Sequence, residues 1–200
     1  MITFLFVIIG AYLIGSIPAG YLLCRFIKKI DIRKYGSGNI GATNVYRVAG
    51  GKLASAVLVF DILKGLLPVL VAKIFSLPIV YIISTGIASI AGHNFSIFLK
   101  GRGGKGVSTG FGVVIGIFPF PALLSLIVWL AVVIPTRYVS LGAITASLFL
   151  PFLVYLFHKD IFLTITGIII SVIIIYAHRS NIKRLLTKKE NKINLPWEKR

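Results

Sequence analysis

The chain has 200 residues, of which 57% are hydrophobic and only 14% are charged, too few polar residues to cover an ordinary soluble domain. The net charge is nevertheless +17, from 22 Lys and Arg against 5 Asp and Glu. High apolar content and high positive charge occur together when basic loops separate apolar membrane spans, so we interpret the charge as orientation and lipid contact and expect no nucleic-acid binding.

The first apolar run, 2–23, is long enough to cross a bilayer. It has no basic residue before it, whereas Arg25, Lys28 and Lys29 follow it. A cleaved signal peptide has the reverse order of charge, so we predict a retained span with the N-terminus outside. Cys24, the single cysteine, cannot form an intramolecular disulfide, and an apolar site disfavours its thiolate, so we expect a structural role.

A glycine-rich loop, 36–41, follows the charged segment 30–35. We expect a short helix over 42–49, ended by Gly50 and Gly51. Glycines let backbone N–H groups turn toward an anion, and helix N-termini attract phosphate. With Arg47 on the helix, this segment predicts a phosphate site.

Two further apolar runs, 53–72 and 77–99, predict the second and third spans. Asp61 and Lys64 share one helix face in the second span. A structural ion pair and a direct substrate role both remain open for them. His93 and Asn94 close the third span, and for this histidine an interfacial and a functional role both remain open.

A second glycine-rich loop, 101–106, contains Lys105 and leads into the next apolar run. Both glycine loops match G-x-G-x-x-G, but neither follows a buried strand of a βαβ unit, so we reject dinucleotide binding. Gly106 stands where a Walker A motif needs Ser or Thr. Phosphate binding is the favoured interpretation, and the simpler alternative is that these glycines only form tight turns.

The run 107–134 is too long for one span and contains Pro119 and Pro121, so we divide it into a fourth and a fifth span. Runs 141–157 and 161–177 are the sixth and seventh. The basic tail 178–200 predicts a helix on the membrane surface. We therefore expect one all-α domain, 1–200, a polytopic bundle of seven transmembrane helices. Apart from Lys64, Lys73 and Lys159, every Lys and Arg then lies on the cytoplasmic side, with the C-terminus.

The few acids exclude several kinds of chemistry. Asp31, Asp61, Asp160, Glu190 and Glu198 offer no pair at the spacing of a two-metal site, and no H-E-x-x-H or Cys/His cluster occurs. We therefore expect no metal and no cofactor. The paired aspartates of enzymes that transfer phospho-alcohols from CDP are missing. So is the His-x4-Asp pattern of acyl-CoA-dependent acyltransferases, since Phe98 stands five residues after His93.

Several motifs together form a recognisable combination: they are Gly36-Ser37-Gly38-Asn39, Gly41-Ala42-Thr43-Asn44 with Arg47, Asp61-Ile62-Leu63-Lys64-Gly65, Gly92-His93-Asn94, Phe98-Leu99-Lys100-Gly101, Gly103-Gly104-Lys105-Gly106-Val107-Ser108, and His178, Asn181 and Glu190. In these motifs, and along essentially its whole length, the chain resembles the bacterial acyl-phosphate:glycerol-3-phosphate acyltransferases. The family often has a glycine shortly before its glutamate, where this chain has Thr187-Lys188-Lys189, so the resemblance leaves the role of Glu190 open.

The resemblance implies transfer of a fatty acyl group from acyl phosphate to the 1-hydroxyl of glycerol 3-phosphate, giving lysophosphatidate and phosphate. It implies no protein nucleophile or base, with Lys105, Arg47 and His178 positioning the substrates and a substrate phosphate taking the proton. Contacts to glycerol 3-phosphate are implied for Ser37, Arg47, Lys105, Ser140, His178 and Asn181. The wider predicted substrate site adds Gly38, Asn39, Thr43, Asn44, His93, Gly103, Gly104 and Gly106.

The expected partners are the two substrates and membrane lipids, with no obligate protein partner evident. The expected location is the bacterial cytoplasmic (inner) membrane, with the active site facing the cytoplasm. The main alternative is a transporter or channel for a small organic phosphate, which would place ionisable groups at the bilayer midplane and show duplicated, interrupted helices. A non-catalytic binder of anionic lipid would explain the basic tail but not the glycine loops.

Overall fold

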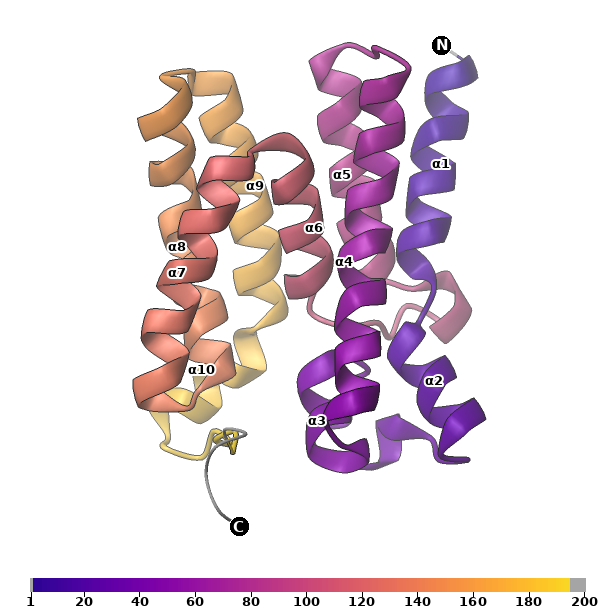
Figure 1. Cartoon of the computed structure of the whole chain (residues 1–200), viewed down its shortest axis with the longest axis vertical. Coiled ribbons are helices and arrows are strands. Elements are labelled where there is room, and N and C mark those ends of the chain that lie inside the picture. The colour runs from indigo at the N-terminus through magenta and orange to yellow at the C-terminus, as the bar shows by residue number, and fades with distance from the viewer. Residues whose placement is uncertain (1, 195–200) are drawn as a thin grey trace. The chain divides into compact units, whose positions relative to one another are not determined.

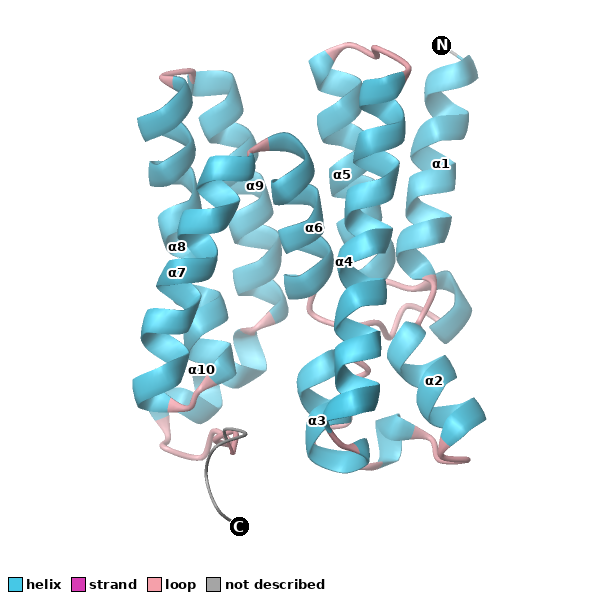
Figure 2. Cartoon of the chain, in the orientation of Figure 1, coloured by secondary structure: helices cyan, strands magenta, loops and turns pink. Residues whose placement is uncertain are grey.

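The computed structural model describes residues 2–194, with side chains from Phe4 onward. The described chain contains helices and loops but no strand (Figure 2). It forms two compact units, Met1–Ile117 and Phe118–Arg200, which are described separately. The all-helical class predicted from the apolar runs is therefore correct for the described residues.

The first unit is built from helices of very different length (Figure 1). In chain order they are α1 (Ile2–Ser16), α2 (Ala19–Ile27), the 3-10 turn η1 (Ile32–Lys34), α3 (Ala42–Ala49), α4 (Gly51–Ile74), α5 (Ile79–Asn94), the 3-10 turn η2 (Ile97–Leu99) and α6 (Val107–Ile117). α1 packs on α5, and α4 packs on α3, α5 and α6.

The predicted first span is not one continuous helix. α1 ends at Ser16 and α2 begins at Ala19, with a bend of 40° between them. Pro18, which lacks an N–H donor, lies at the break. The run predicted as the first span, 2–23, thus consists of two helices, and the break leaves the backbone carbonyl of Ile17 outside the helical ladder and able to accept from another partner.

Small residues allow the helices of the first unit to approach closely. A Cβ atom added at Gly92 of α5 would lie 2.2 Å from the carbonyl oxygen of Tyr12 in α1. One added at Gly65 of α4 would lie 2.1 Å from the carbonyl oxygen of Thr109 in α6. Such backbone contacts are typical of helix pairs in membranes, where packing replaces the hydrophobic effect between helices.

The second unit contains α7 (Pro119–Thr136), α8 (Val139–His158), α9 (Ile161–Ala177) and α10 (Arg179–Leu186). α8 packs on both α7 and α9, and α10 contacts α8 and α9. The predicted division of 107–134 is correct, because α6 ends at Ile117 and α7 begins at Pro119, where a proline at the first helical position loses no hydrogen bond. The tail helix predicted within 178–200 is α10; residues 195–200 lie outside the described chain.

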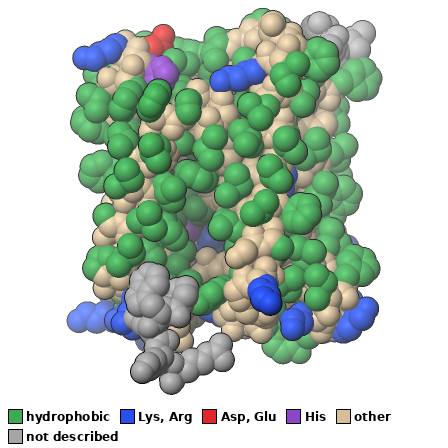
Figure 3. All heavy atoms as spheres, viewed as in Figure 1, with side chains coloured by type: hydrophobic (Ala, Val, Ile, Leu, Met, Phe, Trp, Pro, Cys, Tyr) green, Lys and Arg blue, Asp and Glu red, His purple; other side chains and the backbone are tan. Residues whose placement is uncertain are grey.

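Four stretches are long and apolar enough to cross a membrane, or six if the bent pairs α1–α2 and α9–α10 each count as one. α6, with 11 residues, is shorter than a usual span. Large hydrophobic side chains such as Phe6, Phe60, Phe149 and Ile169 are exposed, and hydrophobic atoms cover much of the face in Figure 3. Exposure on this scale is expected for helices that face lipid.

Candidate phosphate-binding site

The first glycine loop connects η1 to α3. Asp31 caps η1 by accepting hydrogen bonds from the backbone N–H of Arg33 (3.1 Å) and from its guanidinium (2.9 Å). The hydrogen bonds from the Arg33 side chain lower the pKa of Asp31 to about 2, so this turn stays ion-paired at neutral pH. Gly36 and Gly38 then adopt φ of 58° and 72°, which only glycine adopts without strain.

Asn44, on the first turn of α3, organises this loop. Its Oδ1 accepts a hydrogen bond from the Ser37 N–H (2.8 Å), and its Nδ2 donates to the carbonyls of Ile32 (3.4 Å), Tyr35 (3.1 Å) and Asn39 (2.8 Å). The side chain is buried, with 2% of its surface exposed. Its hydrogen-bonding groups are thus directed at the loop backbone.

Asn39 makes the last turn before α3, because its Oδ1 accepts a hydrogen bond from the Gly41 N–H (2.8 Å). α3 begins immediately afterwards, so Thr43 lies in its first turn and Arg47 one turn later. The first N–H groups of a helix have no partner within it and, with the helix dipole, attract anions. The N-terminal end of α3 therefore combines a partial positive charge with the exposed Ser37, while Arg47 lies in the last turn of the same short helix.

The second glycine loop lies against the end of α5. The Gly103 N–H donates to the Asn94 carbonyl (3.1 Å), and the Gly104 N–H donates to the His93 carbonyl (2.9 Å). These two N–H groups therefore bind α5, although the glycine pattern suggested that they would face an anion. Gly106, at φ 78°, then turns the chain into α6.

What this loop presents to a phosphate is its far end. Lys105 is half-buried, and α6 starts two residues later with Val107, Ser108 and Thr109 in its first turn. The N–H groups of that turn are the ones without a helical partner. Both glycine loops thus lead directly into a helix N-terminus, and Lys105 stands just before that of α6, whereas Arg47 lies in the last turn of α3.

Asp61 and Lys64 form the ion pair that was one of the two predicted possibilities. Lys64 Nζ lies 2.8 Å from Asp61 Oδ1 and also donates to the Ile17 carbonyl (2.9 Å) at the break between α1 and α2. His93 Nδ1 lies 3.7 Å from the same Asp61 oxygen. The contact between α4 and His93 joins positions far apart in the chain and carries no signature in the sequence.

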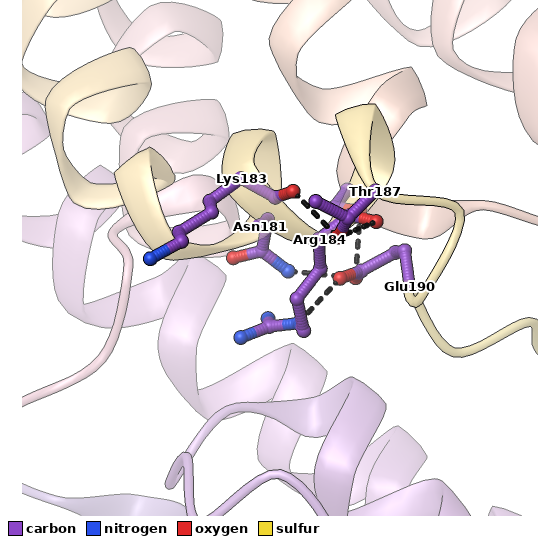
Figure 4. A network of polar contacts seen from close by, with 6 residues as sticks. Asn181, Lys183, Arg184, Thr187 and Glu190 are labelled. Carbon is purple, nitrogen blue, oxygen red and sulfur yellow. Dashed lines mark hydrogen bonds and ion pairs between the residues drawn. The ribbon is translucent and has the colours of Figure 1, made fainter.

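In the second unit, the carboxylate of Glu190 binds two of the predicted site residues, Ser140 and Asn181, of which Figure 4 labels Asn181. Glu190 Oε1 accepts hydrogen bonds from Ser140 Oγ (2.8 Å) and Asn181 Nδ2 (2.7 Å), and its Oε2 accepts one from Arg184 Nε (2.7 Å). Burial alone would raise the pKa of Glu190, but these hydrogen bonds, the one from Arg184 foremost, outweigh it and lower that pKa. The sequence leaves the role of Glu190 open, and no local pattern marks Arg184 as its partner.

His178 occupies the junction of α9 and α10, where it is buried with 2% of its surface exposed. Its Nδ1 lies 2.8 Å from the Ile174 carbonyl, which fixes the orientation of the ring. Asn181 follows in the first turn of α10. His178, Asn181 and Ser140 thus belong to the second unit, whereas both glycine loops and His93 belong to the first.

The chemistry of these groups is that of binding and positioning. Among residues 2–194, no group of three His, Cys, Asp or Glu side chains is arranged to hold a metal ion. The loops offer backbone N–H groups, cations and hydroxyls, which are suited to phosphate.

Known proteins are similar to this chain over nearly its whole length. Residues 5–188 match the family described as glycerol-3-phosphate acyltransferase. The chain belongs to this family. The glycerol-3-phosphate acyltransferase of Geotalea daltonii is 48% identical over 184 residues, which cover 92% of this chain and 94% of the relative. That of Fusobacterium nucleatum is 43% identical over 192 residues, or 96% and 98% of the two chains.

Two solved structures of such an acyltransferase are also similar. They are crystal structures of PlsY (YgiH), an integral membrane glycerol 3-phosphate acyltransferase, in a glycerol 3-phosphate form and a lysophosphatidic acid form. They superpose with TM-scores of 0.91 and 0.89, at 41% identity over 96% of each chain. The present acyltransferase is thus an all-helical integral membrane protein with multiple spans.

Proposed function

We propose that this glycerol-3-phosphate acyltransferase takes its acyl group from acyl phosphate and places it on the 1-hydroxyl of glycerol 3-phosphate, as the first step of phospholipid synthesis. Family membership over residues 5–188 carries the acyltransferase activity and its product, lysophosphatidate. The donor and the position of the hydroxyl are our inference. Two glycine loops that each lead into a helix N-terminus, together with the cations Arg47 and Lys105, support it, because both substrates would bring a phosphate group.

The proposed reaction needs no protein nucleophile. The 1-hydroxyl oxygen attacks the carbonyl carbon of the mixed anhydride, a new ester C–O bond forms, and the bond from the acyl carbon to the phosphate oxygen breaks. The departing phosphate keeps the electron pair and takes the hydroxyl proton. What the protein supplies is proximity and stabilisation of the negative charge that develops.

We assign the proposed role of each side chain from its charge and its hydrogen-bonding groups. Arg47, Lys105 and His178 position the phosphate groups, and Ser37, Ser140 and Asn181 donate hydrogen bonds to glycerol 3-phosphate. Gly38, Asn39, Thr43, Asn44, His93, Gly103, Gly104 and Gly106 complete the proposed substrate site. Thr43 offers the first turn of α3, and Asn39 and Asn44 hold the first loop through the hydrogen bonds described above.

We further propose that residues 1–200 act as one acyltransferase domain in the bacterial cytoplasmic (inner) membrane. Seven spans are obtained if α1–α2 and α9–α10 each count once and the short α6 also crosses. The segregation of Lys and Arg supports an N-terminus outside and a C-terminus and active site facing the cytoplasm. The partners are acyl phosphate, glycerol 3-phosphate and membrane lipids, with no nucleic acid.

The proposed reaction predicts strictly coupled phosphate release. Purified protein in detergent should release inorganic phosphate from acyl phosphate only when glycerol 3-phosphate is present, with equimolar lysophosphatidate. Acyl-CoA and acyl carrier protein, offered in parallel at the same chain length, should give no product. Phosphate release without glycerol 3-phosphate, or a faster reaction with either other donor, would contradict the proposed donor.

A further inference from the structure

Three ionisable side chains are buried together in the first unit. They are Asp61 and Lys64 on α4 and His93 on α5, whose side chains expose 3%, 7% and 4% of their surface. A single carboxylate oxygen, Asp61 Oδ1, faces both Lys64 Nζ at 2.8 Å and His93 Nδ1 at 3.7 Å. We call this group the Asp61–Lys64–His93 cluster.

Ionisable groups within a membrane span are costly unless they are paired. Asp61 and Lys64 compensate each other, since they lie one helical turn apart with opposite charges. Lys64 also reaches the Ile17 carbonyl at the α1–α2 break, so the pair has a clear structural use. Neither observation accounts for the histidine on the neighbouring helix.

His93 is in direct contact with the second glycine loop. A Cβ atom added at Gly104 would lie 2.0 Å from His93 Nε2 and 2.7 Å from its Cε1. The backbone carbonyl of the same histidine accepts the Gly104 N–H at 2.9 Å. The imidazole and the carbonyl of one residue therefore both define where Gly104, and with it Lys105, can lie.

We propose that His93 is a positioning residue for phosphate binding, a role that rests on the proposed function. Its ring supports Gly104 and thereby sets the position of Lys105 and the first turn of α6, while the Asp61–Lys64 pair packs beside the ring, with Asp61 Oδ1 at 3.7 Å from Nδ1. The ring is nearly fully buried and its two nitrogens face Asp61 and Gly104, so it acts on substrate through the loop and not by contact.

The contact between the ring and Gly104 allows a direct test with four proteins: the wild type, His93→Ala, Gly104→Ala and the double variant. Gly104→Ala forces a methyl group into the ring and should lower kcat/KM for glycerol 3-phosphate at least ten-fold. His93→Ala should raise KM five-fold or more with a smaller change in kcat. Because removing the ring makes room for the methyl group, the double variant should match His93→Ala within two-fold.

Ser89→Ala is the matched control. Ser89 lies one turn earlier on α5, is fully buried and donates to the carbonyls of Thr85 (3.1 Å) and Ala11 (3.4 Å). Its variant should change thermal stability and leave KM within two-fold of the wild type. The double variant Asp61→Asn/Lys64→Met changes the same cluster without leaving an unpaired charge. It should also raise KM for glycerol 3-phosphate several-fold.

Two results would overturn the proposal. One is a double variant His93→Ala/Gly104→Ala whose loss equals the product of the two single losses, because ring and loop would then act independently. The other is a His93→Ala protein with unchanged KM and only lower thermal stability, since His93 would then be a purely structural residue.

Calorimetric binding of glycerol 3-phosphate and of inorganic phosphate to the same proteins separates this proposal from the proposed function. A wild-type protein that binds them but makes no lysophosphatidate contradicts the function, while the binding constants of the variants still decide the role of His93. A wild-type protein that binds neither contradicts both.

Discussion

Lys105 stands just before the N-terminus of α6, and Arg47 lies in the last turn of the short helix α3. Replacing either with Ala should lower kcat/KM by roughly 10- to 150-fold, because a charge-assisted contact to phosphate contributes about 1.5–3 kcal/mol. Steady-state kinetics in detergent measures this. Lys73→Ala, which removes an exposed cation from the far end of α4, is the control and should have no effect. A near wild-type rate in Arg47→Ala or Lys105→Ala would remove that residue from the site.

Asn44 illustrates a residue whose importance lies in the loop it holds. Asn44→Ala removes one acceptor and one donor group that serve four backbone partners, so it should lower the free energy of unfolding by about 2 kcal/mol or more and raise KM for glycerol 3-phosphate. Asn39→Ala removes a single hydrogen bond and should cost less. Thermal unfolding with parallel kinetics compares the two. Equal losses of stability would contradict the role assigned to Asn44.

At the scale of elements, Glu190 ties the segment after α10 to α8 and α10 itself. Its pKa lies below the ordinary value of about 4.3. A carboxyl with a lowered pKa stabilises the fold above its ordinary pKa, and this contribution is lost as the pH falls through the lower, folded value. The attachment should therefore be complete at neutral pH and weaken in acid below about pH 4.

Hydrogen exchange of the Ile193 N–H, which donates to the Arg137 carbonyl (2.9 Å), reports on this attachment. Its protection, corrected for intrinsic exchange, should fall between pH 6 and pH 3. Glu190→Gln cannot lose a proton, so it should start with lower protection and show little further change. An equal pH-dependent loss in both proteins would show that another group is responsible.

For the whole molecule, the proposed seven spans place the α4–α5 turn and the tail on opposite sides of the membrane. In a Cys24→Ser background, a cysteine at Phe75 should react with an impermeant maleimide in intact cells. One at Lys189 should react only after permeabilisation. Both positions labelling alike would mean that an even number of spans separates them, as when the short α6 does not cross and only α5, α7, α8 and α9 do.

Much of this architecture was readable in the apolar runs. The helices near 53–72, 141–157 and 161–177 were placed correctly, and Pro119 marked the α6–α7 division. The break between α1 and α2 was missed, although Pro18 stands at it, because the surrounding run stays apolar across the proline. The length of an apolar run predicts whether a segment can cross the membrane. It does not predict whether the helix formed by that segment is continuous.

At the candidate site, the sequence could place the glycine loops and Lys105 because they directly precede the starts of α3 and α6, whereas the roles of these residues stay predictions. The Asp61–Lys64 pair was visible for the same reason, since i and i+3 share a helix face. The contact of His93 with Asp61 and the link from Ser140 to Glu190, 50 residues away, had no local pattern to reveal them. Long-range contacts depend on how helices pack, which spacing along one helix does not specify.

The sequence by itself therefore determined the membrane environment, the helical class and the two loops suited to phosphate, because each depends on composition or on neighbours within a few residues. Only the tertiary structure decided which groups those loops direct outward. The N–H groups of Gly103 and Gly104 are bound to α5, Asn44 binds the backbone of its own loop, and the first N–H groups of α3 and α6 have no partner within their helices. A backbone donor binds one partner at a time, and which partner it has is settled by the packing of the helices around it.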